Sequence, residues 1–366
     1  MLFSDLPIRD DLRSESPYGA PQIDVPIQLN VNENTHPIPE DVARDIVESI
    51  AQAVLTVNRY PDREFVQLRE DLAAYVGDGA SVENLWAANG SNEILQQIMQ
   101  AFGGPGRSIL GFPPTYSMHS IIAAGTGTRW LAGERGEHFA LTPEIVVDWI
   151  ERTDPDIVVL CAPNNPTGTP LDIAVIEAAY SASRGMVIVD EAYVEFMPEG
   201  LPRATTLLQG RERLIITRTM SKAFAFAGAR LGYLIADPAV IDALRLVRLP
   251  YHLSALTQAA ASAALRHAPE MLAMVDDIRE QRDRLLRELP AMGYPVHESW
   301  SNFVLFGGVA DTRATFQALL DAGIIVRDTG IPHHLRVTAG TAAETTAFLE
   351  TLRSLPNVAP VGASVV

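Results

Sequence analysis

The stretch Asp156-Ile-Val-Val-Leu-Cys-Ala-Pro-Asn-Asn-Pro-Thr-Gly168 joins a short apolar run to a turn of proline, asparagine and glycine. A continuous apolar run bounded by turn residues is typical of a strand buried on both faces of a parallel sheet. Similar runs occupy 108–112, 185–190, 213–218 and 231–236, with helical stretches between most of them. Strands that alternate with helices predict βαβ units. We therefore expect an α/β fold whose mostly parallel sheet is covered by helices on both faces.

Amphipathic helices are predicted on the N-terminal side of these strands. Apolar residues recur at helical spacing over 42–54 and again over 65–75, where Gly77 is a suitable C-cap. A third helix begins near Ser91, after a glycine.

Beyond Tyr251 the pattern changes. Long helical stretches come first, and shorter strand-like runs, including one over 324–327, precede a last helix. This order predicts a second, smaller α+β domain. We expect a large domain over 30–255, with 1–29 and 256–366 forming an N-terminal segment plus the small domain.

The composition excludes several classes of function. Of the 366 residues, 47% are hydrophobic and 20% are charged, which is near the globular average and excludes global disorder. The formal net charge of -17 argues against nucleic acid and anionic membrane surfaces as partners. The single cysteine, Cys161, leaves no internal disulfide. We expect a cytoplasmic protein with no signal peptide and no transmembrane helix.

The histidines give no sign of a metal site. His333 and His334 are adjacent, but they lack metal-ligand spacing with other histidines or with cysteine. We interpret them as surface residues and expect no bound metal.

Lysine occurs once, at Lys222. The chain has 28 basic residues, so the other 27 are arginine. A bias that replaces surface lysines by arginine would keep lysine only where an amine is required. Arginine neither loses its proton in a protein nor forms a Schiff base, whereas a lysine amine does both. We therefore predict that Lys222 is a reactive amine.

Polar side chains cluster where the predicted strands end. Ligands of open α/β sheets bind at the carboxyl ends of strands, and a helix N-terminus binds anions. The residues at these ends are Asn165, Asp190, Tyr193, Thr219, Ser221, Lys222, Arg230 and the helix-opening pair Ser91 and Asn92. Each alone is an ordinary turn, strand end or helix cap. Together they supply an amine, an acid, a phenol and an anion cradle, which is the set that holds pyridoxal 5′-phosphate.

These motifs resemble those of the fold-type-I pyridoxal-phosphate aminotransferases. The matching stretches are Asn165-Pro-Thr-Gly168, Asp190-Glu-Ala-Tyr193 and Ser221-Lys222 followed by Arg230. Over nearly its full length the chain resembles the histidinol-phosphate aminotransferases. That resemblance is carried by Leu29-Asn-Val-Asn-Glu-Asn34, Asn58-Arg-Tyr-Pro61, Pro113-Pro-Thr-Tyr116, Ser221-Lys-Ala-Phe-Ala225 and Ile325-Val-Arg-Asp328. The stretch from Trp86 to Glu93 is most similar to the actinobacterial branch.

The resemblance implies a role for each cofactor residue. Lys222 would form the Schiff base and move the proton, and Asp190 would pair with the pyridinium nitrogen. Asn165 and Tyr193 would hydrogen-bond the 3′-oxygen of the cofactor. The remaining contacts would be a stacked ring from Tyr116 and a phosphate site built from Ser91, Asn92, Thr219, Ser221, Arg230 and, from a second subunit, Tyr60.

The resemblance also implies the substrate residues. Arg336 would bind the carboxylate of glutamate, and Arg327 would share the substrate phosphate with Arg336. Tyr18 and Asn32 would close over the imidazole end, with Tyr251 nearby. Lys222, Arg230, Arg327 and Arg336 would then supply the short-range positive charge that an acidic protein needs for anionic ligands.

The implied activity is transamination of L-histidinol phosphate with 2-oxoglutarate, which gives imidazole acetol phosphate and glutamate in histidine biosynthesis. The implied assembly is a homodimer with shared active sites. An aromatic amino-acid aminotransferase of the same subfamily is the main alternative, since it shares almost every cofactor residue, and a phosphothreonine decarboxylase is another. A transcription regulator with the same fold is disfavoured, because it would need a DNA-binding domain and a basic face. Only the substrate pocket distinguishes the enzymes.

Overall fold

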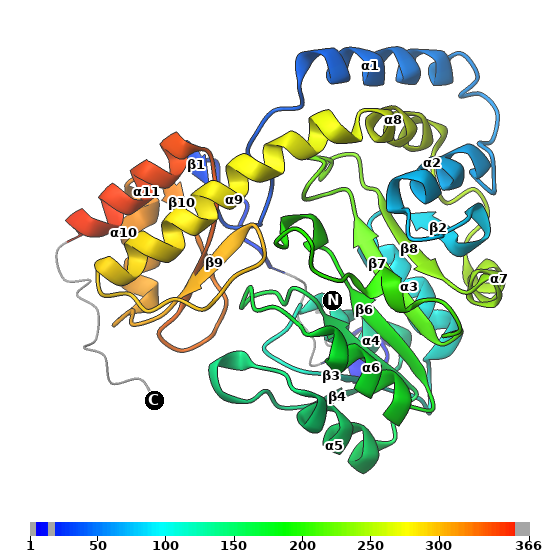
Figure 1. Ribbon diagram of the computed structural model, residues 1–366, viewed down its shortest axis with the longest axis horizontal. Coiled ribbons are helices and arrows are strands. Elements are labelled where there is room, and N and C mark those ends of the chain that lie inside the picture. The colour runs from blue at the N-terminus through cyan, green and yellow to red at the C-terminus, as the bar shows by residue number, and fades with distance from the viewer. Residues whose placement is uncertain (1–4, 14–18, 356–366) are drawn as a thin grey trace.

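The computed structural model describes residues 5–13 and 19–355. A seven-stranded sheet forms the centre of the larger part of the molecule, with strand order β2-β8-β7-β6-β5-β3-β4 (Figure 1). Its strands are β2 (Leu85–Ala88), β3 (Ser108–Gly111), β4 (Arg129–Ala132), β5 (Ile157–Cys161), β6 (Met186–Asp190), β7 (Leu214–Thr219) and β8 (Gly232–Ala236). Five adjacent strands, in the order β7-β6-β5-β3-β4, are parallel. Strand β8 runs antiparallel to both of its neighbours, β2 and β7. The expected α/β fold with a mostly parallel sheet is confirmed.

Burial explains why the central strands are apolar throughout. Every residue of β5 and β7 is buried, because helices cover the sheet on both faces. The helices of this part are α1 (Glu40–Val54), α2 (Val66–Val76), α3 (Ser91–Phe102), α4 (Met118–Thr126), α5 (Pro143–Thr153), α6 (Ile173–Ala182), α7 (Pro238–Val247) and α8 (Ala255–Arg266). Helices α5 and α6 pack together, and α3 packs with α4 and α7. Right-handed crossovers place these two groups on opposite faces of the sheet.

A smaller part lies to one side of the large sheet (Figure 1). It contains an antiparallel sheet in the order β11-β12-β9 and the parallel pair β1-β10. Its elements are β1 (Ile27–Gln28), β9 (Phe303–Phe306), β10 (Ile324–Ile325), β11 (Arg327–Asp328), β12 (Leu335–Thr338), α10 (Thr312–Asp321) and α11 (Ala342–Ser354). Helix α9 (Ala268–Ala291), 24 residues long, runs from α8 to this part.

Most predicted elements are present, and the differences have physical causes. The run expected over 324–327 divides into two strands, because Ile324 pairs with β1 whereas Arg327 pairs with β12. Strand β4 was missed because it is an edge strand whose end residues, Arg129 and Ala132, are exposed. All strands of the seven-stranded sheet fall within 30–255, although the domain boundaries themselves stay a prediction. In the described part of the chain, no helix combines the length and the apolar character needed to cross a membrane.

Truncating a side chain in the centre of the large sheet should destabilise the protein. Ile188 lies in β6 between Val159 and Ile215 on the neighbouring strands and is fully buried. Ile188→Ala should lower the free energy of unfolding by about 2–5 kcal/mol, because it leaves a cavity in a packed core. Urea denaturation measures the change, with Leu201→Ala, at a position 38% exposed, as the control. Equal effects of the two substitutions would contradict the proposed core.

Candidate active site

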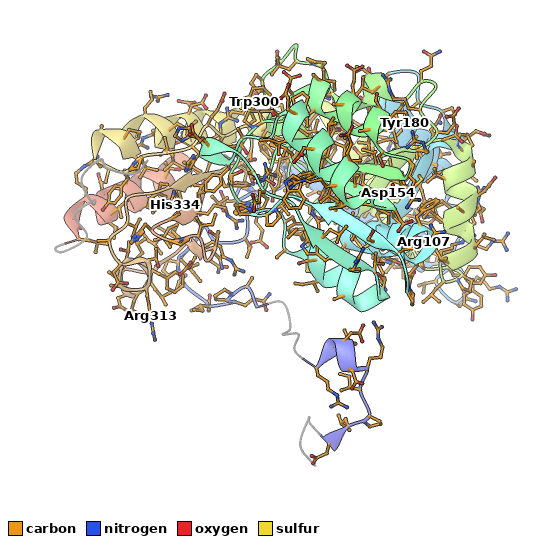
Figure 2. The ribbon with its side chains drawn as sticks, turned by 90° about the horizontal axis from the view of Figure 1, so that it is seen from below. Arg107, Asp154, Tyr180, Trp300, Arg313 and His334 are labelled. Carbon is orange, nitrogen blue, oxygen red and sulfur yellow. The ribbon has the colours of Figure 1, made fainter. Side chains whose placement is uncertain are left out.

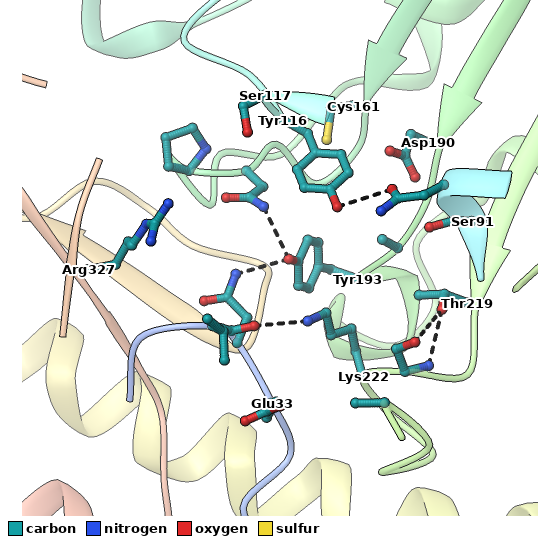
Figure 3. A pocket seen from close by; sticks show the side chains of 18 of the residues that line it. Glu33, Ser91, Tyr116, Ser117, Cys161, Asp190, Tyr193, Thr219, Lys222 and Arg327 are labelled. Carbon is teal, nitrogen blue, oxygen red and sulfur yellow. Dashed lines mark hydrogen bonds between the residues drawn. The ribbon is translucent and has the colours of Figure 1, made fainter. Parts of the chain in front are cut away.

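The carboxyl ends of β5, β6 and β7 open into a cavity of about 490 Å³ (Figure 3). The start of α3 forms one wall, and β11 and β12 of the smaller part form another. The cavity brings together most of the side chains predicted from the sequence, namely Asn32, Ser91, Asn92, Tyr116, Asn165, Asp190, Tyr193, Thr219, Ser221, Lys222, Arg230, Arg327 and Arg336.

Two predicted site residues with a described position do not line this cavity. Tyr60 and Tyr251 stack on each other, with ring centroids 4.4 Å apart, and Tyr60 is 80% exposed. Tyr18 lies outside the described residues. The roles predicted for Tyr60 and Tyr251 in the site stay predictions.

The Lys222 amine lies inside the cavity. Its Nζ donates a hydrogen bond to the Val31 carbonyl oxygen at 3.0 Å. The pKa of Lys222 is lowered to about 8, mainly by burial and then by the positive charge of Arg336, while Glu33 opposes the change. The protonated amine is disfavoured here because it loses water and faces cations. A nucleophilic amine near neutral pH follows from this environment.

The carboxylate of Asp190 is fixed by two buried neighbours. His119 Nε2 donates to one carboxylate oxygen at 2.9 Å, and the Thr217 hydroxyl donates to the other at 3.2 Å. The exposed fraction of Asp190 is 2%, and that of the two donors is zero. Sequence analysis did not identify His119. The available signal was its position in α4, three residues and so about one helical turn after Tyr116.

Amide groups hold the phenol of Tyr193. Asn32 Nδ2 donates to Tyr193 Oη at 2.9 Å, and Asn165 Nδ2 donates to the same oxygen at 3.3 Å. Burial raises the pKa of Tyr193 above its usual range, so the phenol keeps its proton. Because Oη already accepts two hydrogen bonds, its own proton is available to an acceptor in the cavity.

An anion cradle forms where α3 meets β8. The N-terminus of α3 points its free N–H groups at the cavity beside Ser91. Gly90 has a φ of +87°, and a Cβ there would come within 2.6 Å of the Arg230 guanidinium. Thr219 Oγ1 accepts from the Ser221 backbone N–H at 3.1 Å, which holds both hydroxyls beside the cradle. Glycine at position 90 therefore lets a cation and a helix N-terminus converge on one point.

This arrangement fits pyridoxal 5′-phosphate. The cradle suits its phosphate, Asp190 suits the ring nitrogen, and the Tyr193 proton suits the 3′-oxygen. The Tyr116 ring borders the same space, and its hydroxyl donates to Asn92 Oδ1 at 3.2 Å. Lys222 supplies the amine that the aldehyde of the cofactor requires. Together these residues could hold the cofactor.

A second cationic end faces the cofactor residues across the cavity. Arg336 is 7% exposed and donates to Asn165 Oδ1 at 2.6 Å and to the Asn30 carbonyl oxygen at 2.7 Å. Arg327 is its direct cross-strand partner in the antiparallel pair β11-β12, so both side chains lie on the same face of that sheet. In Figure 3, Lys222 lies between Arg327 and the phosphate cradle at Ser91 and Thr219. The cavity thus has two anion-binding ends with an amine between them.

Comparison with known proteins places this chain in a family. The family model for "Aminotransferase class I and II" matches residues 24–352. The chain therefore belongs to the class I and II aminotransferases, which agrees with the fold and with the cofactor residues in the cavity.

Relatives narrow the assignment within that family. The chain is 60% identical over 353 residues to a histidinol-phosphate aminotransferase of Paenarthrobacter aurescens, covering 96% of this chain and 95% of the relative. It is 54% identical to that of Mycolicibacterium smegmatis, covering 98% of each. The histidinol-phosphate aminotransferase of Sinorhizobium meliloti, solved in complex with pyridoxal 5′-phosphate, superposes with a TM-score of 0.80 at 25% identity, covering 91% and 92% of the two chains. This protein is a member of the histidinol-phosphate aminotransferases, with relatives in the actinobacterial branch.

The pKa of Lys222 predicts how fast the cofactor-free protein captures pyridoxal 5′-phosphate. Only the unprotonated amine attacks the aldehyde, so the rate constant should rise about tenfold per pH unit below 8 and level off above it. Arg336→Gln should move this midpoint to higher pH, because it removes a cation that disfavours the protonated amine. Stopped-flow absorbance measures the rates, with Arg313→Gln as a remote control. A wild-type rate that still rose tenfold between pH 9 and 10 would contradict the lowered pKa.

Proposed function

We propose that this protein transfers an amino group between L-histidinol phosphate and 2-oxoglutarate, forming imidazole acetol phosphate and glutamate. The observation that carries the proposal is the pair of anion-binding ends on either side of Lys222. One end accommodates the phosphate of the cofactor. The other, Arg327 with Arg336, accommodates the substrate phosphate in one half of the reaction and a carboxylate of glutamate in the other.

Each residue around the proposed cofactor site then has its own role in the reaction. When bound, pyridoxal 5′-phosphate supplies an electron sink for the charge that develops at the substrate Cα. Lys222 Nζ would take the proton from the substrate Cα and deliver it to C4′ of the cofactor, because its lowered pKa lets it accept and release a proton near neutral pH. Asp190, held by His119 and Thr217, keeps a proton at the pyridine nitrogen. Tyr193 donates to the 3′-oxygen.

Charge explains why the substrate end is built from arginine. With a net charge of -17, the protein does not attract anions from a distance, so affinity has to come from contacts at short range. Arg336 is positioned by two hydrogen bonds and lies over the Phe303 ring, 5.0 Å from its centroid. A planar guanidinium held in this way can bind phosphate or carboxylate with two parallel hydrogen bonds.

The second part of the proposal is a homodimer with shared active sites, acting in the cytoplasm. Large apolar side chains are exposed mainly in two segments, 47–60 and 246–251. The stacked rings of Tyr60 and Tyr251 join these segments. An exposed apolar surface of this kind supports a subunit interface. Through such an interface, Tyr60 would reach the cofactor phosphate of the neighbouring subunit.

A screen of amino donors separates this function from that of an aromatic amino-acid aminotransferase. The cofactor spectrum is followed while histidinol phosphate, phenylalanine or glutamate is mixed with the loaded protein. Conversion should be much faster with histidinol phosphate than with phenylalanine, because only the former offers a phosphate to Arg327 and Arg336. Faster conversion of phenylalanine would favour the aromatic enzyme.

Arg327→Ala should impair reaction with histidinol phosphate selectively. A charge-assisted contact with phosphate contributes about 1.5–3 kcal/mol, so kcat/KM should fall roughly tenfold to a hundredfold. Residual reaction with phenylalanine should change much less, because phenylalanine has no phosphate. Arg313→Ala, at the outer edge of the smaller part (Figure 2), is the matched control. Equal losses on both substrates would indicate a purely structural role for Arg327.

Subunit mixing tests whether Tyr60 acts across the dimer. Lys222→Ala and Tyr60→Ala are each expected to be nearly inactive. After verified subunit exchange, about half of the dimers are mixed, and one of the two sites in each is native, so about a quarter of all sites should recover activity. Activity that stays at the parental level would place Tyr60 in its own subunit's site. Mixing Lys222→Ala with Asp190→Asn is the control, because each mixed site then keeps one lesion.

A further inference from the structure

Three imidazole rings and a phenyl ring gather outside the cavity. His138 and Phe139 belong to the loop after β4, whereas His297 precedes β9 and His334 precedes β12. The Phe139 ring lies 4.8 Å from the His297 ring and 6.2 Å from the His334 ring, and the His138 ring lies 6.4 Å from that of His297, all between centroids. None of these four residues lines the cavity. The cluster is therefore separate from the site described above.

In two of these imidazole rings, the Nε2 atoms face each other. His297 Nε2 and His334 Nε2 are 3.3 Å apart, and the ring centroids are 5.4 Å apart. Two imidazole nitrogens that bind one Zn²⁺ tetrahedrally, each at about 2.0–2.1 Å, lie about 3.3–3.4 Å from each other. The observed separation fits an N–H···N hydrogen bond between the two rings, and it also matches the spacing of two ligands of a single ion. The partners are 37 residues apart in the sequence, which is why the spacing around His334 gave no sign of a site.

The hydrogen bonding of His334 suits metal binding. His334 Nδ1 lies 2.7 Å from the Pro332 carbonyl oxygen, which only accepts, so Nδ1 carries the proton. In the neutral ring Nε2 then presents a lone pair, and the carbonyl is the kind of outer partner that ligating histidines use.

A glycine makes room for the second ring. A Cβ at Gly307 would lie 2.7 Å from His334 Nε2. The φ of Gly307 is not positive, so its backbone conformation does not require glycine. The missing side chain instead provides the space in which the His334 ring reaches His297.

We propose that His297 and His334 form a site for a divalent transition-metal ion of the borderline class, such as Zn²⁺, Ni²⁺ or Cu²⁺. Neutral imidazole favours these ions, whereas Mg²⁺ and Ca²⁺ require oxygen ligands. The described part of the chain contains no group of three or more histidine, cysteine, aspartate or glutamate side chains placed to hold a metal ion. The protein thus supplies two ligands, and water completes the coordination. The exposed face of the cluster gives the ion access from solvent.

Zinc binding by single variants tests the site. Loaded wild-type protein is titrated with Zn²⁺ in competition with a chromogenic chelator. It should bind one ion per chain, and His297→Gln and His334→Gln should each weaken binding by about tenfold or more. His333→Gln is the matched control, since this neighbouring ring bonds the Val309 carbonyl oxygen instead and should not matter. An effect of His333→Gln equal to that of His334→Gln would overturn the proposal.

Gly307→Ala provides a sharper test, because it keeps both histidines. The added Cβ should displace the His334 ring and weaken Zn²⁺ binding to the same extent as His334→Gln. Unchanged binding would show that the two rings do not act as a pair. Cu²⁺ electron paramagnetic resonance of the wild type needs no variant. Two coordinated imidazole nitrogens are expected, and none or one would refute the site.

Discussion

The hydrogen bond from His119 to Asp190 is the interaction around which the active site is arranged. A carboxylate that is 2% exposed is tolerated only where donors compensate for the lost water, and His119 and Thr217 do so from two sides. Asp190 is paired in register with Thr217, so the geometry of the β6-β7 ladder sets the position of the carboxylate. The cradle at α3, the Tyr193 phenol and the Lys222 amine line the same cavity as this fixed acid.

The parts of this arrangement that follow one another in the sequence were predictable. Buried strands appear as continuous apolar runs, and their carboxyl ends carry Asn165, Asp190 and Lys222, so both the sheet and the chemistry of the cavity could be inferred. Contacts that involve the backbone, or residues far apart in the sequence, could not be predicted in this way. Nothing in the sequence indicates that the Val31 carbonyl oxygen accepts from Lys222, and α4 is so apolar that His119 stands out only by its spacing from Tyr116.

The smaller part contributes two arginines to the cavity. Arg327 and Arg336 reach it from two short antiparallel strands, and Arg336 is tied to Asn165 on the large sheet. The same hydrogen bond network continues through Asn165 to Tyr193 and through Asn32 to the smaller part, where Asn302 donates to the Asn32 carbonyl oxygen at 3.0 Å. Direct contacts therefore connect Arg336 to the Tyr193 phenol, and through them a substrate anion bound as proposed would be linked to the proposed cofactor site.

The presence of a single lysine has a consequence for how this protein can be handled. Reagents that acylate side-chain amines have one lysine target in the whole sequence, and it lies inside the cavity. Amine-reactive labels, which usually scatter over a protein surface, would here modify Lys222 and otherwise only the α-amino group. The extent of acylation at Lys222 would thus serve as a direct assay of whether the active site is filled.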